Sequence, residues 1–265
     1  MAEPEENTAE DRAQSTASTA DPREIEKFSA LAEDWWNPDG QFAPLHRLNP
    51  VRLTYVRDRL AAQFGRAPLQ PRPLEGLSLL DIGCGGGLLC EPLARLGAKV
   101  TGLDASATSV EVARRHAELS GLEIAYRHGT AEDLAAAGER FDAVISLEVV
   151  EHVADLTAFL GAAVALARPG GALVLATLNR TPKSYLFAIV GAEYLLRWLP
   201  RGTHDWRRFV RPSELAAGLR AQGAAVTDMI GVAYNPLSDD WRLSRDLDVN
   251  YMLSAIRPQD GPLGA

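Results

Sequence analysis

The sequence predicts an α/β fold in which a doubly wound, mostly parallel sheet carries helices on both faces. From Leu77 onward, short apolar runs alternate with Ala- and Leu-rich stretches of helical spacing, and this alternation is typical of a parallel sheet with crossover helices. The first strand runs into a glycine-rich loop, which is where such sheets bind nucleotides. The expected strands, in chain order, are SLLDI, AKVTGLD, LEIAYRH, FDAVISL and GALVLATL, with helices at about 88–96, 106–119, 131–137 and 153–167.

We expect residues 1–22 to form a disordered acidic tail. They hold six acids, one base and no aromatic residue, so they contribute −5 to the formal net charge of −8 and offer little apolar surface to bury. The remaining chain is near neutral, which argues against nucleic-acid binding. Without a secretory signal, a run able to span a bilayer or more than two cysteines, the chain is expected to be cytoplasmic.

Residues 23–265 are expected to form a single domain that opens with a helical cap, residues 23–73. Its first helix follows Asp21, a capping residue, with a proline at the first helical position and an acid in the first turn. The Asn-Pro-Asp-Gly run at 37–40 ends that helix. A second helix is expected from roughly Pro50 to Phe64, before a proline-rich linker.

The chain beyond the fifth strand begins with an unusual insertion, residues 181–210. A helix that opens at Arg211-Pro212-Ser213, an apolar run at 224–234 and a last strand near 249–256 follow it. No internal repeat interrupts this order, so the insertion belongs to the same domain.

The glycine loop, LDIGCGGG at residues 80–87, predicts a site for an adenosine-containing cofactor. Glycines such as Gly83 and Gly85 let the backbone turn tightly and approach a ligand, beside the free N–H groups of the next helix. Asp104 ends the next strand, 17 residues after the last glycine, where its carboxylate can accept both hydroxyls of a ribose. This pattern alone fits NAD as well as S-adenosylmethionine.

Asp81 and the glycine phrasing favour S-adenosylmethionine. A carboxylate before the glycines is unhelpful near a pyrophosphate but suits the cationic amino-acid end of that cofactor. The GxGxxG phrasing of pyrophosphate sites is absent, because the glycines read GxGGG. The chain also has one nucleotide-binding half and no second substrate domain.

On these motifs the chain resembles the class I S-adenosylmethionine-dependent methyltransferases and, more closely, the ubiquinone-biosynthesis O-methyltransferases. The resemblance covers about residues 23–257, and its most specific parts are WWNPDGQFAPLHRLNPVRLTYV and the Gly-Thr-His-Asp segment near residue 204. Further matching segments are LLDIGCGGGLLCEPLARLGAKVTGLD, SLEVVEHV, TLNRTPKSYLFAIVGAEYLLRWLPRGTHDW and NPLSDDWRLSRDLDVNYML.

The resemblance implies a seven-stranded Rossmann-like sheet whose last strand is antiparallel. It also implies O-methylation of polyprenylated phenols and catechols at both such steps of ubiquinone biosynthesis, from 2-polyprenyl-6-hydroxyphenol and from 3-demethylubiquinol. The implied cofactor contacts are Arg52, Gly83, Asp104 and Leu147, with Arg52 on the cofactor's carboxylate. We add Asp133 as a candidate for the adenine amino group; the alternative is an acid that simply opens a helix.

The segment SLEVVEHV, residues 146–153, places Glu148, Glu151 and His152 at the end of the fourth strand. If the chain turns helical there, the spacing i, i+3, i+4 puts them on one face. Methyl transfer to a phenol of pKa about 10 requires that the hydroxyl proton be removed or weakened. The three side chains could hold a divalent metal, Mg²⁺ or else Mn²⁺ or Zn²⁺, His152 could act alone as a general base, or the segment could merely cap a helix.

The insertion predicts contact with an anionic membrane surface. Residues 182–200 are apolar on nearly every face, and five arginines lie close by, which is typical of an interfacial segment. The arginines are Arg197, Arg201, Arg207, Arg208 and Arg211. We therefore expect residues 182–211 to hold the protein on the inner face of the cell membrane; the alternative is an internal lid. His204 and Asp205 could reach the substrate or pin their loop.

Three other functions remain open at this point. They are a NAD-linked reductase, a methyltransferase acting on carbon or on another small molecule, and a non-catalytic, membrane-associated subunit that binds cofactor. Intact Glu148, Glu151 and His152 argue against the last of these. Other quinone-biosynthesis enzymes are expected partners in addition to the polyprenylated substrate.

Overall fold

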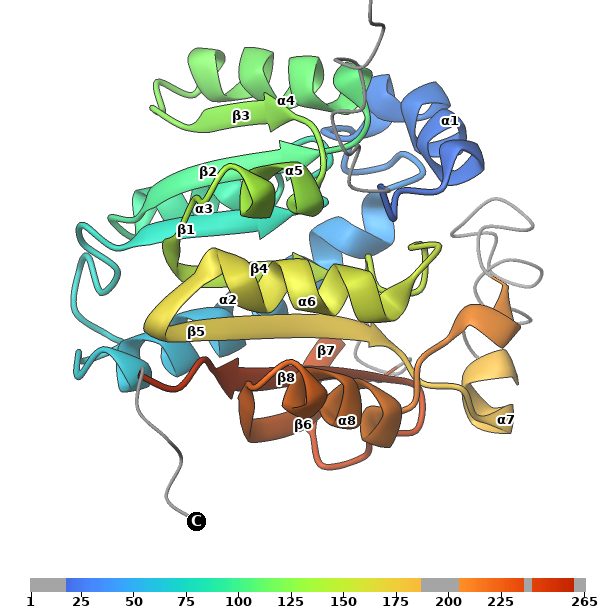
Figure 1. Ribbon diagram of the computed structural model, residues 1–265. Coiled ribbons are helices and arrows are strands. Elements are labelled where there is room, and N and C mark those ends of the chain that lie inside the picture. Colours follow the sequence, from blue (N-terminus) through green and yellow to red (C-terminus); the bar gives the residue numbers. More distant parts are fainter. Residues whose placement is uncertain (1–17, 187–204, 236–239, 260–265) are drawn as a thin grey trace, which may run out of the picture.

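A computed structural model describes residues 18–186, 205–235 and 240–259. Their core is one eight-stranded sheet with the order β3-β2-β1-β4-β5-β8-β6-β7 (Figure 1). The strands are β1 (Ser78–Ile82), β2 (Lys99–Asp104), β3 (Ala125–His128), β4 (Phe141–Leu147), β5 (Ala167–Leu178), β6 (Ala225–Asn235), β7 (Asp240–Ser244) and β8 (Asn250–Ile256). Strands β1 to β5 pair in parallel, whereas β8 pairs antiparallel with both β5 and β6.

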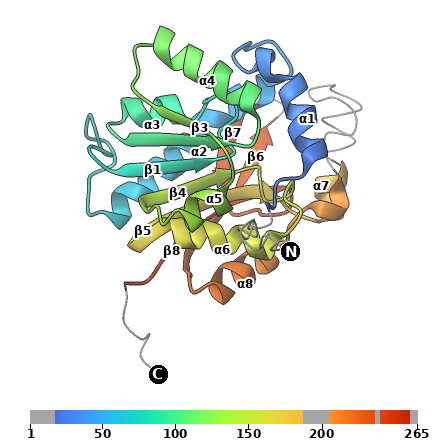
Figure 2. The same ribbon diagram turned by 45° about the horizontal axis from the view of Figure 1, so that its top comes forward.

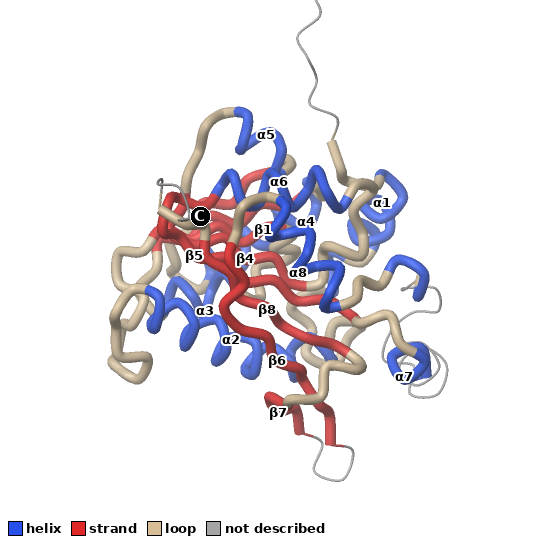
Figure 3. Tube along the Cα trace, turned by 60° about the horizontal axis from the view of Figure 1, so that its bottom comes forward, coloured by secondary structure: helices blue, strands red, loops and turns tan. Residues whose placement is uncertain are grey.

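The predicted fold class is confirmed, with one more strand than the seven expected. The additional strand is β7, which pairs antiparallel with β6 at the outer edge of the sheet (Figure 3). Its sequence, DWRLS, is short and half polar, as edge strands commonly are, and this is why periodicity did not predict it.

Helices cover both faces of the sheet, as the alternation predicted. They are α1 (Pro22–Ala30), α2 (Ala43–Gln63), α3 (Cys90–Arg95), α4 (Ala107–Leu119), α5 (Ala131–Ala136), α6 (Leu156–Leu166), α7 (Pro182–Ser184) and α8 (Pro212–Ala221). Helices α5, α6 and α8 pack on the face that carries Leu80 and Val144. Helices α2, α3 and α4 pack on the other face, which carries Leu79 and Ile145.

The cap begins as the sequence predicts. The Asp21 side chain accepts a hydrogen bond from the Arg23 N–H at 3.0 Å, and Pro22 is the first residue of α1. Helix α1 lies at the end of the sheet to which the arrowheads of β1, β2 and β5 point (Figures 1 and 2). That edge is where ligands bind in open α/β sheets.

Two predicted boundaries in this part of the chain were wrong. Helix α2 starts at Ala43 rather than at Pro50, which lies inside it; burial of residues such as Leu48 against the sheet outweighs the hydrogen bond that a proline cannot donate. Structure also begins before residue 22. Thr19 is 4% exposed, its carbonyl accepts from the Ala154 N–H at 2.7 Å, and Ala20 forms a β-bridge with Val153.

None of the helices in the described parts of the chain is long and apolar enough to cross a membrane.

Candidate active site

A cavity of about 700 Å³ runs along the carboxyl edge of the sheet. Eight of the ten residues that the sequence singles out line it, whereas Glu151 and Asp133 do not. The eight are Arg52, Asp81, Gly83, Gly85, Asp104, Leu147, Glu148 and His152. They come from α2, from the ends of β1, β2 and β4, from the loop after β1 and from the turn after β4, so the topology brings together positions that lie far apart in the chain.

The glycine loop has no room for side chains. Gly85 has a φ of +52°, and a Cβ built on it would lie 2.3 Å from the ring of Trp35. Gly87 has a φ of +87°, and its Cβ would lie 2.2 Å from the Tyr126 hydroxyl. Both the left-handed backbone and the close packing therefore require glycine.

Asp104 is fixed at the end of β2 by two backbone amides. Its Oδ2 accepts from the Gly85 N–H and its Oδ1 from the Ser106 N–H, each at 2.8 Å. Burial raises the pKa of this carboxyl, and the two N–H donors oppose the rise. The geometry ties the acid directly to the glycine loop, as the nucleotide-site prediction requires.

Asp81 lies beneath the loop and is only 3% exposed. Burial raises its pKa to about 7, and the neighbouring Asp104 adds to the rise while Cys90 and Arg52 oppose it. The Cys90 thiol donates to Oδ2 at 3.3 Å. A carboxyl that ionises near neutrality at this position responds strongly to any cation that enters the cavity.

Glu148 has a left-handed backbone, with a φ of 58°. Its Oε1 lies 2.5 Å from Nη2 of Arg52, and Arg52 is 7% exposed. A non-glycine residue in this conformation costs about 1 kcal/mol or more. The strained turn aims the carboxylate back across the cavity toward α2.

Glu151 is buried beside the cavity and does not line it. Thr177 Oγ1 donates to its Oε2 at 2.8 Å, and Oε1 is buried without a hydrogen-bond partner. Burial, followed by the nearby Glu148, raises the pKa of Glu151 well above its usual range. The side chain is therefore held as a neutral acid under the site.

His152 is paired with an acid that the sequence did not single out. Its Nδ1 lies 2.8 Å from Glu24 Oε2, and the hydrogen bond from His152 is the main cause of the lowered pKa of Glu24. Phe28, one turn further along α1, meets the imidazole edge-on at 5.3 Å between ring centroids. Glu24 and Phe28 are four residues apart, so the sequence could place them on one face of α1. It could not show that this face meets His152, because the two segments are far apart in the chain.

The expected common face of Glu148, Glu151 and His152 does not form. Residues 148–153 adopt turns, and α6 starts only at Leu156, where Asp155 caps it by accepting from the Ala158 N–H at 3.0 Å. Each of the three side chains has a different partner, namely Arg52, Thr177 and Glu24. As arranged, they do not fit a divalent metal, and the described residues contain no group of three His, Cys, Asp or Glu side chains that could hold one.

Comparison with known proteins identifies the family. A family model described as a methyltransferase domain matches residues 80–175. The ubiquinone biosynthesis O-methyltransferase of Brucella anthropi is 58% identical over 241 residues, which cover 91% of this chain and 97% of that protein. That of Chelativorans sp. is 58% identical over 91% of this chain and 95% of its own length. The chain belongs to the ubiquinone biosynthesis O-methyltransferase family.

Solved structures support the fold. The magnesium protoporphyrin IX methyltransferase of Synechocystis, crystallised with S-adenosylhomocysteine, aligns with a TM-score of 0.63 at 22% identity over 88% of this chain and 97% of that one. An S-adenosylmethionine-dependent methyltransferase from Clostridium acetobutylicum aligns with a TM-score of 0.58 at 11% identity over 88% and 98%. This methyltransferase therefore has the class I fold that its sequence predicted.

Asp133 of this methyltransferase forms a capping box instead of lining the cavity. Its Oδ2 accepts from the Thr130 hydroxyl at 2.7 Å, and the Asp133 N–H donates back to that hydroxyl at 3.3 Å. The neighbouring Glu132 lines the cavity, and its Oε1 accepts from the Thr19 hydroxyl at 2.7 Å. Asp133 therefore stabilises the start of α5, which is the alternative role given for it above.

Arg208 and Asp205 have structural contacts in this methyltransferase. Arg208 donates to Asp21 Oδ2 at 3.1 Å and to the Val153 carbonyl at 3.0 Å. Asp205 caps the 3₁₀ turn Trp206–Arg208. Arg207 and Arg211 are exposed. Residues 187–204, which include Arg197, Arg201 and His204, lie outside the described part of the chain.

The raised pKa of Asp81 predicts a pH-dependent stability. The folded ligand-free protein keeps this proton up to about pH 7, whereas an unfolded chain loses it near pH 4. Unfolding therefore releases a proton between these pH values, and rising pH favours the unfolded state. Relative to an Asp81→Asn variant, we expect the free energy of unfolding of the wild type to fall by on the order of 4 kcal/mol at most between about pH 4 and pH 7.

Denaturant titrations at several pH values measure this difference. Glu118→Gln, which changes an exposed acid, is the control and should follow the wild type at every pH. Parallel stability curves for the wild type and Asp81→Asn would contradict the prediction.

Proposed function

We propose that this chain is an S-adenosylmethionine-dependent O-methyltransferase that methylates ring hydroxyls of polyprenylated phenols and catechols in ubiquinone biosynthesis. The observation that carries the proposal is that one cavity joins the glycine loop and Asp104 to Glu148 and His152, in a chain 58% identical to enzymes of that name. Both O-methylation steps belong to the proposal, because each substrate presents a hydroxyl on a prenylated ring.

The cofactor would lie between α2 and the carboxyl ends of β1 and β2. Asp104 is placed for the ribose hydroxyls, the glycine loop for close approach of the backbone, and Arg52 for the carboxylate of the amino-acid end. Asp81 and Leu147 complete this side of the cavity. When bound, the cofactor supplies an electrophilic methyl group on a sulfonium centre.

In the structure, Glu148 forms an ion pair with Arg52. Binding of a cofactor carboxylate at Arg52 would replace this partner. A carboxylate released from Arg52 would remain in the cavity and face the substrate ring. Arg52 thus links the cofactor side of the site to its chemical centre.

His152 would serve as the general base. Nδ1 of His152 lies 2.8 Å from Glu24 Oε2, so Nε2 would be the nitrogen that accepts the substrate proton. The substrate hydroxyl would pass its proton to Nε2 of His152, and the carboxylate of Glu24 would stabilise the imidazolium that forms.

A metal-assisted route would need a different arrangement of the same residues. Glu148 would have to leave Arg52, Glu151 would have to turn out of the core, and His152 would have to exchange Glu24 for the metal ion. Mg²⁺ is the ion that such oxygen-rich ligands would prefer. We therefore favour the base pair of His152 and Glu24 and test it against metal removal.

The function itself is tested by mass spectrometry. A prenylated catechol incubated with the protein and S-adenosylmethionine should gain one methylene unit, and fragmentation should place it on oxygen. Transfer to a ring carbon would instead indicate a C-methyltransferase. Reduction of the substrate with NADH, or absence of any methylated product, would overturn the proposal.

The catalytic pair predicts a loss of turnover in Glu24→Gln. An amide cannot stabilise the imidazolium as a carboxylate does, so we expect kcat to fall about tenfold or more. Glu26→Gln changes an exposed acid of the same helix and should keep the wild-type kcat.

Dialysis against a chelator distinguishes the two routes. The wild type should keep its rate if His152 and Glu24 act as the base. Loss of activity that returns on addition of Mg²⁺ would contradict that mechanism and support the metal route.

We also propose peripheral attachment to the inner, cytoplasmic face of the cell membrane through residues 182–211, where other quinone-biosynthesis enzymes are the expected neighbours. Tyr185 and Leu186 are 48% and 55% exposed, and Arg207 and Arg211, near the other end of the segment, are exposed too. Apolar side chains beside bases suit anionic lipid headgroups. A polyprenylated substrate would itself reside in the bilayer.

Co-sedimentation with anionic liposomes tests this attachment. Replacing Arg197, Arg201, Arg207 and Arg211 by Gln should reduce binding, because each lost base weakens the attraction to the anionic surface. Arg208 is left intact because it holds Asp21 and Val153. Binding that equals the wild type at low salt would contradict the electrostatic part of the proposal.

A further inference from the structure

The cavity continues well past the residues assigned to the chemistry. Beyond β4 its walls come from the ends of β5, β8, β6 and β7 in spatial order, and these strands contribute mainly apolar side chains. The residues are Leu178, Val249, Asn250, Val232, Tyr234 and Trp241. Strand β7 lies four strands from β4, a separation of about 19 Å across a sheet with about 4.8 Å per strand. The cofactor residues lie on the opposite side, at β1 and β2.

The β6–β7 hairpin presents one apolar face. Val232 pairs with Leu243 and Tyr234 pairs with Trp241 in the antiparallel register, so all four side chains lie on the same side of the hairpin. The Tyr234 and Trp241 rings are in contact at 5.0 Å between centroids. Arg242, one residue on from Trp241, lies on the other face.

Helix α2 forms the facing wall. This helix contacts β7, and its Leu48 lines the same cavity and belongs to the hydrophobic cluster that also includes Val232 and Trp241. Within the part of the chain that the structure describes, the outer end is open, because Tyr234 and Trp241 are only partly buried and Leu243 is 39% exposed. The section is thus an apolar slot that starts at the reaction centre and ends at the surface.

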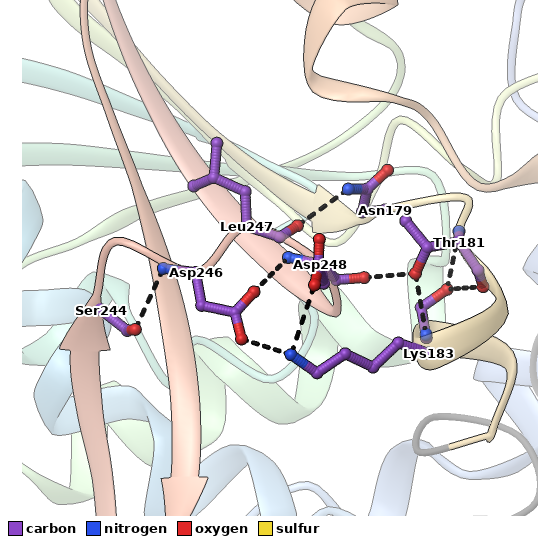
Figure 4. Close-up of polar contacts among 8 residues, drawn as sticks. Asn179, Thr181, Lys183, Ser244, Asp246, Leu247 and Asp248 are labelled. Atoms are coloured by element: carbon purple, nitrogen blue, oxygen red, sulfur yellow. Dashed lines mark hydrogen bonds and ion pairs between the residues drawn. The ribbon is translucent and has the colours of Figure 1, made fainter.

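A polar network holds the rim of this slot in place (Figure 4). The Asn179 amide donates to the Leu247 carbonyl at 2.8 Å, and the Thr181 hydroxyl donates to the Asp248 carbonyl at 2.6 Å. Lys183 forms ion pairs with Asp246 and Asp248. Lys183 is thus shared by two acids, which leaves a net charge of −1 on this trio and disfavours an anionic ligand in the slot.

We infer that this slot between α2 and the β6–β7 hairpin is a subsite for the isoprenoid chain of the substrate, with Tyr234 and Trp241 as its outer wall. The inference rests on the function proposed above and adds where the hydrocarbon part of the substrate lies. A branched, uncharged chain matches the apolar face and gains stability from every unit that it buries. Because the slot opens to the surface, the first isoprene units bind to the protein and any further units continue outside it.

The test compares catechols that carry no isoprene unit with catechols that carry two or three. The measured quantity is the ratio of kcat/KM for the prenylated catechol to kcat/KM for the bare catechol. In the wild type this ratio should rise with the first units and then level off. Trp241→Ala should lower the ratio about tenfold, because the shortened side chain no longer covers the chain.

Two further variants keep the test interpretable. Arg242→Ala alters the opposite face of the same strand and should leave the ratio at the wild-type value, and Trp241→Leu should restore most of it. Calorimetric binding of S-adenosylhomocysteine to each variant checks that the site is folded. An unchanged ratio in Trp241→Ala would overturn the inference, whereas a wild type that methylates no catechol would overturn the proposed function instead.

Discussion

The close packing of side chains against the glycine loop is the constraint on which the rest of the site depends. Three elements occupy the space that a Cβ would take: Val149 from the turn after β4 at Gly83, Trp35 from the cap at Gly85, and Tyr126 from β3 at Gly87. The indole of Trp36 adds a hydrogen bond to the Gly86 carbonyl at 2.8 Å. The loop is thereby held against the turn after β4, strand β3 and the cap, and the cap carries Glu24 and Arg52 to the cavity.

The surroundings of the carboxyl groups in the site give them different pKa values. Burial keeps Glu151 neutral and brings Asp81 to a pKa of about 7, while the contact with His152 lowers the pKa of Glu24. These different pKa values suit different roles: Glu24 orients His152, Asp81 responds to the charge of a ligand and Glu151 supports the fold. Arg52 and Glu148 form a nearly buried pair, and removing one partner would leave the other charge uncompensated.

The sequence predicted what depends on local pattern. Strand and helix alternation, the glycine loop with Asp104, and the start of α1 at Asp21 all follow from periodicity, backbone freedom and capping, and the structure has them. The resemblance to a known family supplied Arg52, which lies in the cavity.

What the sequence could not predict depends on contacts between distant segments. Glu24 and His152 are 128 positions apart and meet only because the cap folds over the sheet. Asp133 was a candidate either for the adenine amino group or for the start of a helix. The Thr130 hydroxyl donates to it, so it caps the start of α5. Arg208 was expected to belong to a basic patch, but in the structure it donates hydrogen bonds to Asp21 and to the Val153 carbonyl. The chain does not turn helical at 148–153, where Glu148 has a left-handed backbone, so Glu148, Glu151 and His152 do not share a helix face.

The walls of the cavity come from two parts of the chain, one inside and one outside the segment that matches the methyltransferase family model. The segment shared with methyltransferase domains at large, residues 80–175, supplies the floor: the glycine loop, Asp104 and the turn around His152. The side walls, with Glu24, Arg52 and Trp241, lie outside that segment. Changes in the two flanks of the chain would therefore alter the proposed subsite at Trp241 and also, at Arg52, a contact proposed for the methyl donor, while the floor between them stays the same.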